Sequence, residues 1–186
     1  MMRNTQQCKY NEIFYSERQR FRQWWLWTLL MIIPTISIWA MFQQFVMGAP
    51  FGNNPASNYL LIILVAITGI GFPMFMYITG LDTQVRHCGL YIRFKPFHRK
   101  WMIFEFENMQ KVEPVIYKPL MAYGGFGIRY GKKGKAYNVS GNKGVFMTLK
   151  NGKTILIGSN NHKVLYSAIT EKLSSTTMVD VQKTQQ

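Results

Sequence analysis

The sequence predicts a membrane α-helical hairpin followed by a small all-β barrel or sandwich that is capped by a C-terminal helix. Two long segments without any charged residue predict the hairpin. Short segments rich in Val, Ile, Tyr, Phe and Trp, separated by Gly, Asn and Lys clusters, predict the β domain. The 186 residues include 22 Lys and Arg against 8 Asp and Glu, a formal net charge of +14. This composition excludes intrinsic disorder, and two cysteines are too few for a disulfide framework.

The first element after an N-terminal segment (1–23) is a predicted transmembrane helix over residues 24–47. At about 1.5 Å per residue it can cross a hydrocarbon core of about 30 Å. A short external loop (48–58) leads to a second predicted transmembrane helix over 59–80. We interpret both as membrane spans, because the rest of the chain is too short to bury two such helices in a soluble core.

Positive charges next to the spans predict their orientation. Arg18, Arg20 and Arg22 precede the first span, Arg86 and Arg93 follow the second, and the loop has no charge. Because Lys and Arg near a span favour the cytoplasmic side, we expect a multi-pass plasma-membrane protein with both termini in the cytoplasm. Neither span contains an ionisable residue, which argues against a transporter or pump.

The segment 81–173 is the predicted cytoplasmic β domain. With the tail it carries 17 Lys and Arg against six Asp and Glu. The pattern predicts antiparallel strands, with Asn151-Gly152 as a type I′ hairpin turn. The strands are expected over 83–87, 90–96, 101–106, 111–118, 127–130, 136–140, 145–150 and 153–158.

After the last predicted strand, the spacing of apolar residues changes to that of a helix. The apolar residues that recur at this spacing are Val164, Leu165, Ala168, Ile169 and Leu173. They predict one amphipathic helix, which packs against the sheet. The polar tail (174–186) is expected to be disordered.

Strands followed by one closing helix resemble the pleckstrin-homology-like fold. Thr83-x-Val85, Gly89-Leu90-Tyr91-Ile92-Arg93-Phe94 and Trp101-x-Ile103 are similar to bacterial domains of this kind that follow a two-helix membrane hairpin. The segments FRQWWLW, PFGNNPA, GIRYGKKGKAYNVSGNKG and LIGSNN resemble an uncharacterised family of prokaryotic two-helix membrane proteins, over residues 12–173. The resemblance implies a module that binds lipid headgroups or protein segments, with no assigned reaction.

A glycine-rich stretch over 123–144 contains the first candidate site. Its basic residues are Arg129, Lys132, Lys133, Lys135 and Lys143. Glycines allow close backbone approach, and the cations suit anionic lipid or another phosphate-bearing partner. A hairpin with solvated charges accounts for the same residues. The spacing of the glycines matches neither a dinucleotide fingerprint nor a P-loop.

A second basic cluster alternates with aromatic residues and comprises Arg93, Lys95, Arg99 and Lys100. Interleaved basic and aromatic side chains can stack nucleic-acid bases, and an amphipathic strand with its aromatics in the core accounts for the same residues. The positive-inside rule explains part of the charge and a membrane tether restricts the domain to the bilayer surface, so a nucleic-acid partner is disfavoured. Glu105 and Glu107 would share one face of a strand, and Cys88 follows His87. Neither pair carries a recognised catalytic motif, and we expect no enzyme activity, cofactor or metal.

The sequence therefore favours a non-enzymatic, membrane-anchored binding or scaffold protein. Its basic domain is expected to contact the inner membrane surface, with anionic headgroups as ligands, or a protein partner. A homo-oligomeric interaction module without lipid recognition is the alternative. An enzyme acting on anionic membrane substrates is the least favoured hypothesis.

Overall fold

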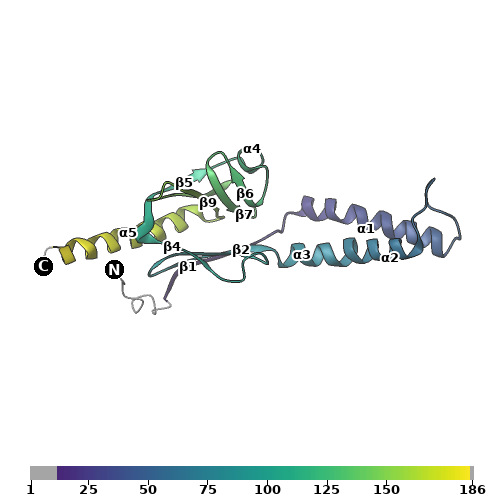
Figure 1. The fold of residues 1–186 in the computed structure, drawn as a ribbon, viewed down its shortest axis with the longest axis horizontal. Coiled ribbons are helices and arrows are strands. Elements are labelled where there is room, and N and C mark those ends of the chain that lie inside the picture. Colours follow the sequence, from purple (N-terminus) through teal and green to yellow (C-terminus); the bar gives the residue numbers. More distant parts are fainter. Residues whose placement is uncertain (1–11, 185–186) are drawn as a thin grey trace. The chain divides into compact units, whose positions relative to one another are not determined.

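The computed structural model describes residues 12–184, and the chain folds as two compact units. One unit, residues 21–79, is a helical hairpin, and the other joins residues 12–20 to residues 80–184. Figure 1 shows the helices of the first unit and the sheets with the closing helix of the second. The β domain therefore begins before the hairpin, whereas the sequence predicted that it would begin at residue 81.

The hairpin consists of two helices that are long and apolar enough to cross a membrane. The first is α1 (Trp24–Phe45). The second, Asn58–Ile78, comprises α2 (Asn58–Val65), the π-helical turn η2 (Ala66–Gly71) and α3 (Phe72–Ile78). The helices end two residues earlier than the sequence predicted, because Gly48 has a φ of 67° after the first and β2 begins at Gly80 after the second.

Small residues bring the two helices together. Gly69 lies against Pro34, whose Cβ is 3.7 Å from the position that a Cβ at Gly69 would occupy. Ser37 and Ala40 are also buried on α1. At the closed end, the Gln44 side-chain amide donates to Asn58 Oδ1 at 2.6 Å and to the Ala56 carbonyl at 3.0 Å. These contacts pack the two helices of the hairpin against each other, since small residues allow close approach.

The first sheet has four antiparallel strands in the order β1-β2-β3-β4. They are β1 (Ile13–Arg20), β2 (Gly80–Arg86), β3 (Gly89–Lys95) and β4 (Met102–Glu105). Strand β1 lies in the segment that the sequence analysis treated as a separate N-terminal piece. It pairs with β2 over its length, so that Arg20 lies opposite Gly80 and Arg18 opposite Asp82.

The second sheet has five strands in the order β5-β8-β9-β7-β6. They are β5 (Met109–Ile116), β6 (Gly127–Gly131), β7 (Gly134–Asn138), β8 (Lys143–Leu149) and β9 (Thr154–Gly158). All eight predicted strands are present, but β7 and β9 pair in parallel, so the expectation of a purely antiparallel domain is wrong. The short helix α4 (Pro119–Tyr123) lies between β5 and β6 in the chain, and its Tyr123 packs on Ala136 and Leu156.

The β8–β9 turn differs from the predicted type I′ turn. Gly152 has a φ of 78°, but no residue other than glycine has positive φ among those described. The Gly152 amide donates to the Leu149 carbonyl at 2.9 Å, and the Lys153 amide donates to Asn151 Oδ1 at 3.0 Å. A type I turn followed by a left-handed glycine therefore closes the hairpin, because the Asn151 side chain stabilises the turn without positive φ at its own backbone.

The helix α5 (His162–Thr184) contacts β5 and β8 of one sheet and β1 and β2 of the other. Leu165 and Ile169 are fully buried, whereas Val164 is 58% exposed and is not part of the core. The predicted disorder from residue 174 is also wrong for the described part. The helix continues to Thr184 because no Gly or Pro interrupts it, and the Ser174 hydroxyl donates back to the Glu171 carbonyl. Residues 185–186 lie outside the described range.

A polar network fixes β1 to the start of α5. The Glu17 carboxylate accepts hydrogen bonds from the Ser159 hydroxyl at 2.6 Å and from the Asn160 amide at 2.8 Å. The buried Gln19 side chain donates to the Gly158 carbonyl at 2.7 Å. Burial, together with Glu17, raises the pKa of the Tyr15 hydroxyl. Strand β1 is thus an integral part of the β domain.

Candidate functional site

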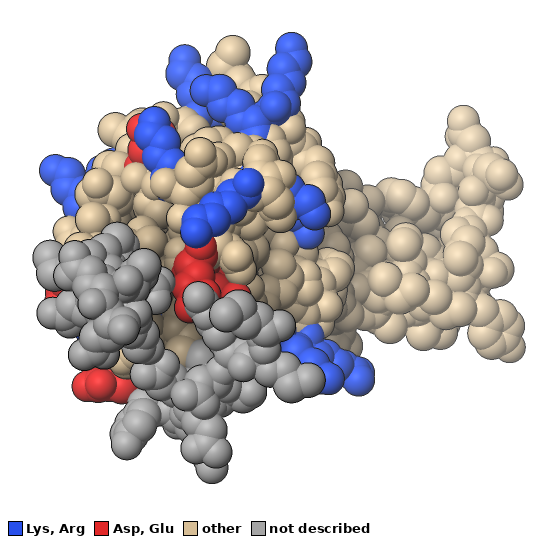
Figure 2. All heavy atoms as spheres, turned by 60° about the vertical axis from the view of Figure 1, so that its left-hand side comes forward, with Lys and Arg blue, Asp and Glu red and all other residues tan. Residues whose placement is uncertain are grey.

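Basic side chains are spread over the β domain. Figure 2 shows many Lys and Arg groups and few Asp and Glu groups on the visible face of this unit. Sheet register and turn geometry divide these cations into separate groups. Two groups are compact: one surrounds a carboxylate on the first sheet, and the other lies on two neighbouring turns.

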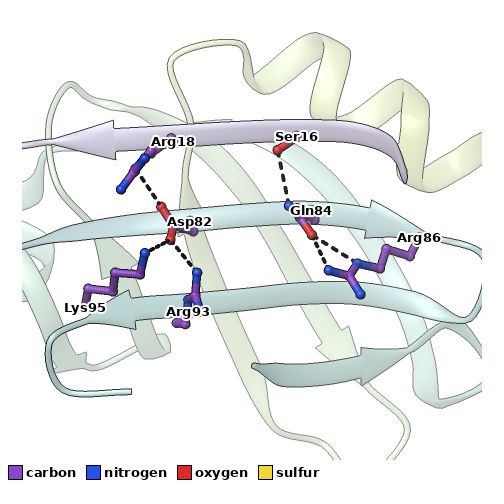
Figure 3. A network of polar contacts seen from close by, with 7 residues as sticks. All are labelled: Ser16, Arg18, Asp82, Gln84, Arg86, Arg93 and Lys95. Carbon is purple, nitrogen blue, oxygen red and sulfur yellow. Dashed lines mark hydrogen bonds and ion pairs between the residues drawn. The ribbon is translucent and has the colours of Figure 1, made fainter. Parts of the chain in front are cut away.

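The first group surrounds Asp82, which is 8% exposed at the middle of the first sheet. Asp82 Oδ2 lies 3.2 Å from Arg93 Nη2 and 3.1 Å from Lys95 Nζ. Asp82 Oδ1 lies 3.5 Å from Nε of Arg18. Figure 3 shows Arg18 on β1 and both β3 cations directed at this carboxylate on β2. We call Arg18, Arg20, Asp82, Arg93 and Lys95 the Asp82 cluster.

Two arginine side chains, one in this cluster and one beside it, lie over the ring of Trp101. The guanidinium carbon of Arg93 lies 4.5 Å from the Trp101 ring centroid, and that of Arg86 lies 5.4 Å from it. Arg86 also lies over the Tyr91 ring at 4.7 Å and donates two hydrogen bonds to Gln84 Oε1. Cation–π contacts of this kind restrict the orientation of a guanidinium group.

The second group lies on the β3–β4 and β6–β7 turns. Lys132 and Lys133 form the exposed tip between β6 and β7. Lys135 Nζ lies 5.1 Å from the Tyr130 ring centroid and 4.9 Å from that of Tyr137.

His98, from the β3–β4 turn, packs on Tyr137 of β7 with ring centroids 5.9 Å apart. Burial and the charge of Lys135 lower the pKa of His98. The β3–β4 turn therefore contacts strand β7 through this histidine and tyrosine. Arg99 and Lys100 are exposed on the β3–β4 turn. We call Arg99, Lys100, Lys132, Lys133 and Lys135 the basic turns.

The structure separates residues that the sequence analysis had grouped. Arg129 lies opposite Ala136 on the face of the second sheet that packs against Tyr123, whereas Lys135 faces the other way. Lys143 is at the opposite end of this sheet, where its carbonyl accepts from the Ser159 amide at 3.0 Å. In the second predicted cluster, Arg93 and Lys95 belong to the Asp82 cluster, apart from Arg99 and Lys100.

Sequence reasoning missed several basic residues of these surfaces. Arg18 and Arg20 were assigned only to membrane orientation, because β1 was not predicted. Lys153 precedes Thr154, whose hydroxyl donates to the Lys133 carbonyl at 2.7 Å, so it extends the basic surface at this end of the sheet. The signal available in the sequence was the alternation of Arg18, Arg20 and Arg22, which is compatible with a strand.

The residues weighed for catalysis do not form a site. Glu105 ends β4 and accepts a hydrogen bond from Asn108, whereas Glu107 lies in the short helix η3 (Phe106–Asn108), so they do not share a strand face. Cys88 is disulfide-bonded and carries no thiolate, and the other cysteine, Cys8, lies outside the described residues. Among residues 12–184, no three His, Cys, Asp or Glu side chains are grouped to hold a metal ion.

The fold and these surfaces define a class of protein in which an apolar helical hairpin is inserted between two paired strands of a basic β domain. The chain belongs to a family of unknown function (DUF6141), whose model matches residues 9–176. This match spans the hairpin, both sheets and the packed part of α5. A comparison with curated proteins finds no match.

Proposed function

We propose that this chain is a non-enzymatic membrane anchor whose β domain binds the anionic inner surface of the plasma membrane. The two apolar helices act as spans, and two sheets closed by a helix act as a pleckstrin-homology-like binding domain. The observation that carries the proposal is the placement of the basic turns. No enzyme activity or cofactor is part of this function.

Sheet register supports this placement. Arg20, Gly80 and Lys95 form the last row of the first sheet, so the β3–β4 turn leaves at the end where the chain continues into the hairpin. Along the chain only Thr79 separates α3 from β2. Such a short connection limits how far Gly80 can lie from the last residue of the span.

The chemistry of the basic turns suits that surface. Phe97, on the β3–β4 turn, is 62% exposed beside Arg99 and Lys100. An apolar side chain among cations can enter the headgroup region while the cations meet lipid phosphates. Each Lys or Arg near an anionic surface contributes about 1 kcal/mol at physiological salt.

Hydrogen exchange of the full chain in lipid nanodiscs tests this proposal. Amides of residues 97–101 and 131–135 are expected to exchange more slowly in anionic than in neutral nanodiscs, and high salt should remove the difference. Substituting Lys132→Gln, Lys133→Gln and Lys135→Gln together should abolish it, because about 3 kcal/mol of surface attraction is lost. The pair Lys143→Gln on β8 and Lys163→Gln on α5, which removes two charges away from the basic turns, is the control. Equal exchange in both lipids would refute lipid binding.

The alternative function is binding to a protein partner, which can be a second copy of the chain, through a different surface. Leu120 and Met121 on α4 are 73% and 82% exposed, and Ile116 is 72% exposed. Exposed apolar side chains gathered at one place favour protein contacts. Slow exchange at residues 116–123 that is independent of lipid charge but dependent on protein concentration would indicate self-association.

Both termini are proposed to be cytoplasmic, because arginines flank both helices at the β-domain side and the loop has no charge. A C-terminal fusion to a reporter that fluoresces only in the cytoplasm should be bright. A dark fusion, together with activity of a reporter that works only outside, would reverse the orientation.

A further inference from the structure

The outer face of the first sheet carries an unusual concentration of positive charge around Asp82. Arg18, Asp82 and Arg93 lie directly opposite one another on three paired strands. Arg20, Gly80 and Lys95 form a parallel row two residues along. From standard strand spacings, the four basic residues leave the backbone at the corners of a rectangle of about 10 Å by 7 Å.

Asp82 is the one acidic residue of the Asp82 cluster. Asp82 faces Arg18, Arg93 and Lys95, and Arg20 extends across Gly80, where there is no side chain. The Asp82 cluster therefore has a formal charge of +3. A buried Nε of Arg93 has no hydrogen-bond partner, although the neighbouring Nη2 of the same group reaches Asp82. The Asp82 carboxylate offsets part of the repulsion among these cations, and a bound anion would offset more of it.

The geometry suits one class of anion. Guanidinium groups present paired N–H donors that match the oxygens of a phosphate group, and a lysine adds a point charge. Trp101 holds the Arg93 guanidinium in a fixed orientation, which reduces the entropy lost on binding. A phosphomonoester carries about two negative charges at neutral pH, more than a phosphodiester or a carboxylate.

We propose that the Asp82 cluster binds the dianionic phosphate of a phosphomonoester. The group can come from a lipid headgroup or from a soluble metabolite, since both present the same chemistry. The site is formed by β1, β2 and β3, and it shares no residue with the basic turns. It therefore does not depend on the proposed surface binding by those turns.

Calorimetric titration of the full chain in uncharged detergent micelles with glycerol 3-phosphate tests the site. Saturable heat is expected beyond that of chloride at matched ionic strength. The pair Arg93→Gln and Lys95→Gln should weaken binding about tenfold or more, because two charge-assisted contacts are lost. Arg18→Gln with Arg20→Gln, on strand β1, should also weaken it. The pair Lys143→Gln and Lys163→Gln should leave it unchanged.

Nanodiscs distinguish the two sources of the phosphate. If a lipid is the ligand, discs containing phosphatidic acid should slow amide exchange in β1–β3 more than discs containing phosphatidylglycerol of equal total charge. If a soluble compound is the ligand, only glycerol 3-phosphate should slow amide exchange in β1–β3. Slower exchange with phosphatidic acid or with glycerol 3-phosphate supports the site. No effect of any phosphomonoester, equal effects of the two lipids without binding of the soluble compound, or equal losses in the control pair would overturn it.

Discussion

A chain in which a Gly-Asn-Gly-Ser linker replaces residues 21–79 is expected to fold as a soluble β domain. Arg20 and Gly80 lie directly opposite each other on antiparallel strands, so the whole helical hairpin occupies the position of a β-hairpin loop. A short linker with glycines can connect two such ends. The core of the β domain lies in a separate unit, and it retains every strand in this shortened chain.

The matched comparison is a fragment that begins at residue 80. It lacks β1, which leaves β2 as an unpaired edge and removes the Gln19 and Glu17 hydrogen bonds to Gly158, Ser159 and Asn160. Loss of a whole strand exposes buried apolar surface and unpaired backbone groups, so this fragment is expected to aggregate or remain unfolded. Circular dichroism and dispersed amide resonances measure both outcomes. A folded fragment, or an unfolded linker chain, would contradict the role assigned to β1.

Strands β2 and β3, which the sequence predicted, have a feature that β1 lacks. Most of their inward positions are apolar, for example Leu81, Val85 and Ile92, and all three are fully buried. In β1 the residues facing the domain include Glu17 and Gln19, which are held by hydrogen bonds instead of apolar packing. The alternation of apolar and polar residues that predicts a strand is therefore absent from β1. Its partner β2 also follows β1 in the sequence only after the two apolar helices.

The sequence also could not predict which basic residues of the candidate sites lie together in the fold. Sequence proximity grouped Arg129 and Lys143 with Lys132, but strand register places them on another face and at another end of the sheet. The contact between Arg18 and Asp82 joins residues 64 positions apart, so no local pattern could reveal it. Basic residues that are close within one turn, such as Lys132 and Lys133, were correctly grouped because a turn is local.

Truncation of one side chain on α5 is expected to have a large effect on stability. Leu165 is fully buried on a helix that contacts both sheets, so Leu165→Ala should lower the free energy of unfolding by about 2–5 kcal/mol. The neighbouring Val164 is 58% exposed. Val164→Ala is therefore expected to change stability by less than about 0.5 kcal/mol, because alanine also has the higher helix propensity.

Urea denaturation of the linker-joined β domain compares the two variants directly, and thermal unfolding of the full chain in detergent provides an independent measurement. The difference between adjacent positions isolates burial, since both substitutions remove only aliphatic groups from the same helical turn. A loss of stability for Leu165→Ala no larger than for Val164→Ala would mean that α5 does not close the core. Because α5 joins the two sheets, its detachment should also loosen the contact between the β3–β4 turn and strand β7 at His98 and Tyr137.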